Sequence, residues 1–234
     1  MRNKDNIVAK RGALFMIDLK HACQQLGMTV VHIKTDSIKI ADATPEDINF
    51  ITKFGEDYGY EFEHEATYDA FCLVNDAVYV ARQGKGEDAK WTAVGAQFQH
   101  PYVFKTLFSE QDILFNDMCE TKQVQKGAIY MDFSNGFKPG PGDIDQMRFV
   151  GKTGRFVPVT ESSGMGATLY RFSEDKFYAV SGTKGHQWAE AEHINNLIKA
   201  GEEVEFDMTY FEKLVEDARD TIDHFGPYAV FANG

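Results

Sequence analysis

Apolar residues recur along the chain with two different periods, and these periods predict where helices and strands form. Between residues 6 and 26 the apolar side chains share one broad stripe, which ends at Gly27, a residue suited to the left-handed cap of a helix. Residues 29–33 and 37–40 are rich in β-branched side chains and flank a polar turn, so they predict a β-hairpin. The stripe consists of Val8, Leu14, Phe15, Ile17, Leu19, Ala22 and Leu26.

The next segments predict a second helix and a second hairpin. Thr44 stands before Pro45 and two acidic residues, which is the form of a helix start, because a threonine oxygen can cap the first turn and acids favour its positive end. In the later segments apolar and polar residues alternate, which is typical of strands, and polar residues interrupt this alternation where turns are expected. These elements are strands at 68–74 and 77–82 with a turn at Asn75 and Asp76, a strand at 91–94 and a short helix at 102–108.

This order of elements predicts an α+β fold in which helices cover one face of an antiparallel sheet. After about residue 110 the pattern changes to a Gly- and Pro-rich segment, followed by further strands and two closing helices. We therefore expect residues 1–110 to form one layered subdomain and residues 111–234 a mixed β/helical region. The later elements are expected as strands at 155–159, 168–172 and 177–180 and as helices at 186–199 and 207–224.

Composition narrows the class of protein. The chain has 234 residues and 43% hydrophobic content, which is enough to bury the core of one ordinary domain or two small ones. No run approaches the ~20 apolar residues of a membrane span, and the amino terminus does not resemble a secretory signal, so we expect a soluble, cytoplasmic protein with no membrane partner. Cys23, Cys72 and Cys119 have neither disulfide-framework nor zinc-site spacing and are expected to be buried apolar residues.

The net charge of −12 is unevenly distributed. Residues 1–20 carry five Lys and Arg against two Asp and Glu, whereas residues 201–234 carry nine acidic residues against two basic ones. Any contact with a polyanion is therefore expected in the first half of the chain. The acidic tail is expected to be a solvated helix face or a partner surface.

The candidate chemistry lies in the first predicted hairpin. A carboxylate at the tip of a hairpin is held rigidly and can be presented to a hydrated Mg²⁺ ion and the phosphates of a nucleotide. Asp36, between Thr35 and Ser37, has this setting. An Asp in such a position is also a common turn former, so the surrounding sequence has to decide between the two interpretations.

That surrounding sequence resembles family B DNA polymerases, most closely the shorter polymerases of tailed phages. The resemblance covers roughly the first 110 residues at the level of motifs, and the rest of the chain only in its general pattern of strands, loops and helices. It is carried by residues 31–40 (VHIKTDSIKI), by the preceding helix with its segment 9–15 (AKRGALF), by residues 73–80 (LVNDAVYV), and by residues 95–98 and 101–108.

The resemblance implies a partial palm subdomain in residues 1–110, a thumb-like or carboxy-terminal region in 111–234, and DNA-templated addition of nucleotides to a primer. In that family a Thr-Asp-Ser turn supplies a metal ligand, which implies that Asp36 binds metal in a two-Mg²⁺ site, with Thr35 and Ser37 beside it. A later strand with a Lys-x-Tyr sequence holds the primer terminus, which implies a primer contact at Tyr79. The other expected DNA contacts are the basic residues Lys10, Arg11 and Lys34.

Two positions depart from the family pattern. Lys34 stands where the family usually has the first acid of the turn, and Ala77 stands where it has the primer-contacting Lys. The family's other catalytic Asp and its nucleotide-binding helix precede the region where this chain begins. Because a two-metal site needs carboxylates from both places, we expect the chain to act on primer-template DNA and deoxynucleoside triphosphates together with an amino-terminal polymerase fragment or within a longer chain.

Two other functions stay open at this point. The chain could be a non-catalytic DNA-binding or assembly module that keeps the palm fold. A metal-dependent nuclease would need several acids on one face, and Asp36 has no obvious companions in the sequence. Glu63 and Glu65 could lend a further carboxylate, although solvent-facing strand positions are the plainer expectation. His32 is expected to be a packed or half-exposed strand residue and not a ligand.

Overall fold

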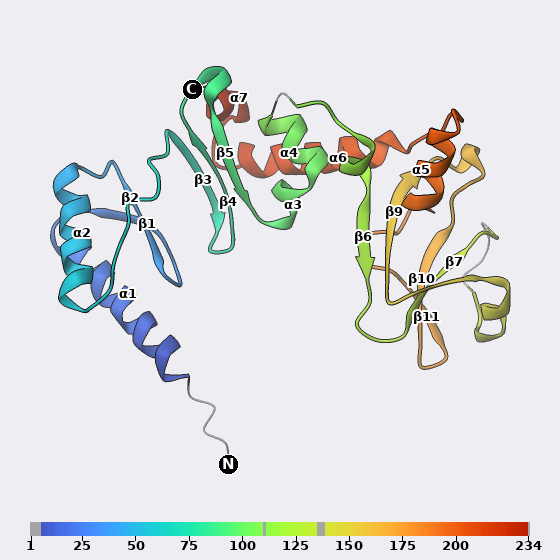
Figure 1. Cartoon of the computed structure of the whole chain (residues 1–234), viewed down its shortest axis with the longest axis horizontal. Helices are drawn as coiled ribbons and strands as arrows, with labels where there is room; N and C mark the ends of the chain where they lie inside the picture. The colour runs from blue at the N-terminus through green and yellow to red at the C-terminus, as the bar shows by residue number, and fades with distance from the viewer. Residues whose placement is uncertain (1–5, 110, 135–138, 234) are drawn as a thin grey trace, which may run out of the picture. The chain divides into compact units, whose positions relative to one another are not determined.

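The protein combines helices with antiparallel sheets (Figure 1). The computed structural model describes residues 6–109, 111–134 and 139–233. Every strand pairing in it is antiparallel, and helices alternate with the sheets along the chain, which confirms the α+β fold class. Within these ranges, each helix is too short or too polar to span a bilayer.

The chain divides into two compact units. The first runs to Gly95 and also takes in the segment that begins at Phe225, and the second comprises Ala96–His224. This division differs from the boundary expected near residue 110. The difference arises because helix α4 (Pro101–Phe108) packs on helix α6 (Met208–Asp223), where the rings of Tyr102 and Phe211 stack at 4.6 Å.

The described residues of unit 1 up to Gly95 contain two α-helices and two separate sheets instead of the single sheet that the sequence predicts. The sheets are the hairpin β1–β2 and the three-stranded sheet β3–β4–β5. A short helix from the carboxy-terminal end of the chain, α7, belongs to the same unit. The elements are α1 (Ile7–Gln25), β1 (Thr29–Lys34), β2 (Ser37–Ala41), α2 (Pro45–Asp57), β3 (Ala70–Asn75), β4 (Val78–Gln83), β5 (Lys90–Val94) and α7 (Tyr228–Asn233).

Local signals fix the ends of the first two helices. Asn6 caps α1 by accepting a hydrogen bond from the backbone N–H of Ala9, and Gly27 follows the helix with a φ of 86°, as the sequence predicts. Thr44 caps α2 in a reciprocal box with Asp47, whose carboxylate accepts from the Thr44 backbone N–H at 2.9 Å.

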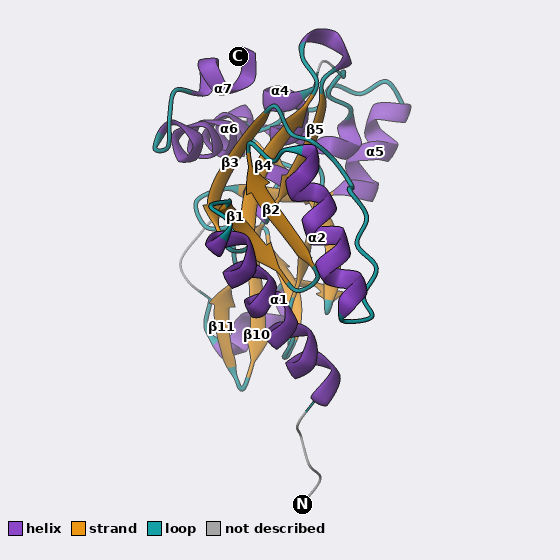
Figure 2. Cartoon of the chain, turned by 90° about the vertical axis from the view of Figure 1, so that its left-hand side faces the viewer, coloured by secondary structure: helices purple, strands orange, loops and turns teal. Residues whose placement is uncertain are grey.

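The core of unit 1 lies between α1, α2 and one face of the β1–β2 hairpin (Figure 2). The apolar stripe of α1 is only partly used, because Phe15 and Leu19 are buried whereas Val8, Leu14 and Ile17 are exposed. The buried residues of this core are Phe15, Met16, Leu19, Cys23 and Ile51.

Helix α7 is attached to the β3–β4–β5 sheet by one buried cation. Arg82 of β4 is 3% exposed and donates hydrogen bonds to the backbone oxygens of Phe231 and Ala232, at 3.3 and 2.7 Å. A guanidinium at the last carbonyls of a helix satisfies their hydrogen bonds and the negative end of the helix dipole. The rings of Trp91 and Phe231 add an edge-on contact at 5.4 Å.

Unit 2 is built on a four-stranded sheet in the order β11-β10-β7-β8 and a three-stranded sheet in the order β12-β9-β6. The expected strands at 155–159, 168–172 and 177–180 correspond to β9, β10 and β11. The elements are α3 (Ala96–Gln99), α4, β6 (Glu120–Gln123), β7 (Ala128–Asp132), β8 (Arg148–Gly151), β9 (Thr153–Val159), β10 (Thr168–Ser173), β11 (Lys176–Ala179), β12 (Gln187–Glu190), α5 (Ala191–Lys199) and α6.

The helix predicted at residues 186–199 is wrong in its first part. Residues 187–190 form strand β12, which pairs with β9, and helix α5 begins only at Ala191. Strand pairing across the sheet overrides the helical pattern here, since Trp188 and Ala189 lie opposite Pro158 and Val157 and both are buried. The predicted helix at residues 207–224 is confirmed as α6.

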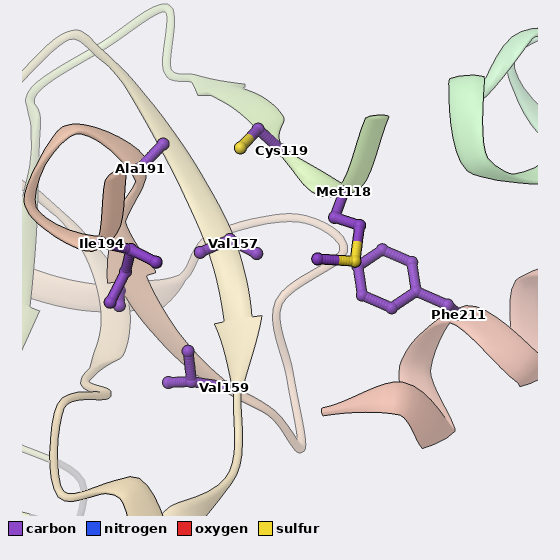
Figure 3. Close-up of a cluster of buried hydrophobic side chains, with 8 residues drawn as sticks. Met118, Cys119, Val157, Val159, Ala191, Ile194 and Phe211 are labelled. Atoms are coloured by element: carbon purple, nitrogen blue, oxygen red, sulfur yellow. The ribbon is translucent and has the colours of Figure 1, made fainter. Parts of the chain in front are cut away.

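Two apolar clusters hold unit 2 together. In the first, Val157 and Val159 of β9 face Ile194 of α5, and the side chain of Met118 packs against the ring of Phe211 (Figure 3). The second surrounds Trp188, which is fully buried and donates its indole N–H to the backbone oxygen of Thr183 at 3.1 Å.

A buried polar network centred on Glu120 of β6 accompanies these clusters. Its carboxylate accepts hydrogen bonds from the Lys122 ammonium at 2.6 Å, from His100 at 3.3 Å and from the Tyr210 hydroxyl. Burial opposes ionisation of Glu120, but these three donors outweigh it and lower the pKa of the carboxyl to about 2. Burial, together with the Glu120 charge, raises the pKa of Tyr210.

Candidate functional site

Asp36 lies at the tip of the β1–β2 hairpin, as the sequence predicts. Lys34 and Ser37 are the last paired residues of the two strands, so Thr35 and Asp36 form a two-residue turn. The backbone N–H of Asp36 and the hydroxyl of Ser37 both donate to the backbone oxygen of Lys34, at 2.5 and 3.3 Å. The Asp36 side chain is exposed. A carboxylate is therefore presented to solvent from a turn fixed by hydrogen bonds.

Thr35 has an unusual backbone conformation for its type. Its φ is 41°, in the left-handed region that β-branched residues rarely adopt because Cβ crowds the backbone. The pairing of β1 with β2 on either side holds it there. Such strained residues are found more often at functional sites, and this one immediately precedes Asp36.

A bulge in β1 determines which side chains lie on each face of the hairpin. The register shifts between Val30 and His32, which reverses the alternation of side chains beyond that point. Val30 and Ile33 therefore both pack with the helical core, whereas His32 lies on the other face. On β2, Lys39 pairs with His32 and so shares that second face.

This second face meets the hairpin formed by β3 and β4 (Figure 1). His32 is 4% exposed, and its Nε2 donates to the backbone oxygen of Asp76 at 3.1 Å. The Lys39 ammonium lies 5.1 Å from the centre of the Tyr79 ring, and that ring stacks on Phe71 at 5.2 Å. The hairpin that carries Asp36 and the hairpin that carries Tyr79 are thus in direct contact.

Tyr79 is held in a partly buried setting. Burial, reinforced by the negative charge of Glu65, raises the pKa of its phenol, so the hydroxyl stays protonated and able to donate. Glu63 and Glu65 themselves are exposed and precede the second hairpin in a segment without regular structure, so the expected strand there does not form. Ala77 lies exposed in the turn before β4.

A groove of about 680 Å³ runs between α1 and β1 and reaches both hairpin turns. Its walls are mostly apolar, and Thr35 and Asp76 lie at its edge. Lys10 and Arg11 are exposed on the same helix, beside groove residues Ala9 and Gly12. The residues of α1, of β1 and of the turn after β1 that line the groove are Val8, Ala9, Gly12, Ala13, Met16, Ile17, Lys20, Val30, Val31, His32, Ile33 and Thr35.

The fit of this site to Mg²⁺ is partial. In the described part of the chain, no group of three or more His, Cys, Asp or Glu side chains is placed to hold a metal ion. Mg²⁺ keeps several waters and is commonly bound by one or two carboxylates together with substrate phosphates. The exposed carboxylate of Asp36 is suited to provide one ligand of such a coordination shell. The remaining ligands would have to come from a nucleotide and from another polypeptide segment.

No protein-family model matches the chain, and a search of curated proteins finds no relative. Sequence reasoning missed two residues that shape the site, His32 as the link between hairpins and Lys39 as the cation over Tyr79. The sequence did contain a signal for Lys39, because the alternation of side chains along a strand places it on the face of the hairpin opposite to that of Ile38 and Ile40. The contact of His32 spans 44 residues of sequence and has no local signal.

Proposed function

We propose that this chain takes part in DNA-templated DNA synthesis as the carboxy-terminal part of a viral family B DNA polymerase. One observation carries the proposal: the exposed carboxylate of Asp36 projects from a two-residue turn whose hairpin is fixed against the hairpin of Tyr79. Both residues match motif positions of the family that the sequence resembles. The geometry supports a metal-binding turn beside a primer-binding strand.

Each proposed role follows from the chemistry of the side chain. Asp36 provides the negative charge that holds a divalent ion at the hairpin tip, and Mg²⁺ there would stabilise the charge that develops on the phosphates during transfer. Tyr79 donates its hydroxyl to the primer backbone. Lys10 and Arg11, which are exposed on α1, bind phosphates of the primer-template. Thr35 and Ser37 hold the turn in shape.

The surface of α1 supports the need for a protein partner. Ile7, Val8 and Leu14 are 73%, 82% and 62% exposed, and Val8 also lines the apolar groove. Contiguous exposed apolar surface of this kind marks a protein contact in soluble proteins. We propose that an amino-terminal polymerase fragment covers it and brings the second catalytic Asp and the triphosphate-binding Lys to Asp36.

A specific observation favours the alternative, a non-catalytic DNA-binding or assembly module. Lys34 replaces an acid of the family's turn, Ala77 replaces its primer-contacting Lys, and both are exposed where those groups would act. A chain that had lost turnover would keep the hairpins and tolerate such changes. The alternative predicts that the chain assembles with the amino-terminal fragment, and that Asp36 makes no contribution to the rate of primer extension.

Primer extension separates these functions. The purified chain alone, with Mg²⁺, nucleotides and a primed template, should show no extension, because it supplies only part of the metal site. Adding an amino-terminal polymerase fragment from the same genome that carries the missing Asp should give extension. Extension by the chain alone would contradict the proposal. A complex that forms but is equally inactive with wild-type and Asp36→Asn chains would favour the alternative.

A further inference from the structure

The four-stranded sheet of unit 2 has an aromatic face opposite its core face. Ile129, Met131 and Leu169 point into the buried cluster around Trp188. Because side chains alternate along a strand, the residues between them point the other way. Paired residues share a face, and the pairs on this second face are aromatic: Tyr130 with Tyr170, Tyr130 with Phe149, and Phe172 with Phe177.

These five side chains form one continuous surface, which we call the aromatic platform. Ring centres are 5.4 Å apart for Tyr130 and Phe149, 6.1 Å for Tyr130 and Phe172, and 4.7 Å for Phe172 and Phe177. Phe177 is 3% exposed and forms the floor, whereas Phe149 on β8 is 63% exposed. Tyr130, Tyr170 and Phe172 are partly exposed. Tyr130 and Phe149 meet edge to face at an interplanar angle of 69°, and the exposure of Phe149 leaves its ring accessible to a flat ligand that can stack on it.

Exposed lysines flank the platform. Lys126 lies two residues before β7 and Lys152 directly follows β8, whereas Lys176 of β11 pairs with Ser173 and therefore shares the opposite face with Tyr178. The backbone oxygen of Lys152 accepts from the N–H of Val124 at 2.9 Å, which brings the first two segments together. Acidic side chains also lie near the platform: Glu174 and Asp175 are exposed in the β10–β11 turn, and burial together with the charge of Asp132 raises the pKa of Tyr170.

The charge of unit 2 differs between its sheets and its last helices. Residues 120–190, which form the sheets, contain nine Lys and Arg and eight Asp and Glu, whereas residues 191–224 contain three and ten. The negative charge of the unit is therefore concentrated in its last helices. The sheet region is close to neutral and can accept a polyanion where lysines gather.

We propose that the aromatic platform binds single-stranded DNA. Bases stack on Phe149 and Tyr130, and the flanking lysines bind the phosphates, which is the combination that single-strand-binding surfaces use. A duplex hides the faces of its bases, so the platform should prefer unpaired strands. Only the choice of DNA over RNA rests on the function proposed above; the stacking site itself belongs to a different unit from Asp36.

The test is binding of a fluorescent 20-nucleotide oligo-dT to the full chain at low salt, followed by anisotropy. Phe149→Ala should raise Kd by about tenfold, in the range that loss of one stacked base gives. The matched control is Tyr178→Ala, because Tyr178 is 42% exposed on the same sheet but on the core-side face, where Arg171 covers its ring. Circular dichroism should show both variants folded, since neither ring is buried.

A crosslinking measurement locates the bound strand, so that binding at the platform is distinguished from binding elsewhere on the chain. A strand containing 5-iodouracil should crosslink at Tyr130, Phe149 or Tyr170. Equal affinities of wild-type and Phe149→Ala chains, tighter binding of duplex, or crosslinks confined to residues before Gly95 would overturn the platform. A preference for oligo-U would overturn the choice of DNA. None of these readouts requires primer extension, so failure of the polymerase proposal would be seen separately.

Discussion

The imidazole Nε2 of His32 lies 3.1 Å from the backbone oxygen of Asp76, and this hydrogen bond joins two hairpins that are separate in sequence. The first hairpin carries Asp36 at its tip and the second carries Tyr79 on its returning strand. The bulge in β1 turns His32 toward this contact, while Val30 and Ile33 of the same strand pack with the helical core. A hydrogen bond thus joins the hairpin that carries Asp36 to the hairpin that carries Tyr79.

His32→Phe should lower the free energy of unfolding by about 1 kcal/mol, because it removes the donor to Asp76 but keeps a planar ring in the same space. The measurement is urea denaturation of the purified chain. His21→Phe is the matched control, since His21 is exposed on α1 and its replacement should leave stability nearly unchanged. Equal stability of wild-type and His32→Phe chains would show that the link between hairpins contributes nothing.

The Glu120 network should make unit 2 sensitive to acid. Because the pKa of Glu120 is lowered from 4.5 to about 2 on folding, its contribution is complete above pH 4.5 and is lost as the pH falls toward 2. Glu120→Gln should therefore destabilise the protein at pH 7, on the order of 3 kcal/mol, and much less at pH 3. Urea midpoints at both pH values give the comparison. A difference that does not change with pH would contradict the role of the carboxylate charge.

Lys34→Asp should be tolerated when the chain is assembled with the proposed amino-terminal polymerase fragment. The substitution restores an acid that the family usually has at this place, next to the turn of Thr35 and Asp36. A second carboxylate near the proposed metal site should change the affinity for Mg²⁺ more than it changes the stabilisation of charge in the transition state. We therefore expect a modest change in the extension rate and a shift in its dependence on Mg²⁺ concentration. The measurement is extension rate against Mg²⁺ concentration. A loss as large as that of Asp36→Asn would mean that the Lys34 ammonium is itself required.

Local sequence signals predicted much of the fold. Gly27 after α1, the Thr44 cap of α2 and the turn at Asp36 each depend on a few neighbouring residues, and the structure has all three. Strand β12 could not be found in this way, because its residues follow a helical pattern and only pairing with β9 makes them a strand. The return of α7 to the first unit depends on Arg82, which is 150 residues away from Ala232 in sequence.

The candidate site shows the same division between local and distant signals. Asp36 was placed correctly from its flanking strands alone, whereas the contact of His32 with Asp76 depends on how two hairpins pack. The aromatic platform could not be recognised without the register of β7, β8, β10 and β11, since its five rings come from four strands. In the sequence those residues read as ordinary β-formers.

The most direct test of the proposed function is single-turnover primer extension by the Asp36→Asn chain assembled with the proposed amino-terminal polymerase fragment. This substitution keeps the size of the side chain and removes the charge that would hold the metal ion at the hairpin tip. We predict a loss of at least about a hundredfold in rate, the scale expected for one preorganised charged group at a transferring phosphate. Retention of more than about a tenth of the wild-type rate would contradict metal binding by Asp36.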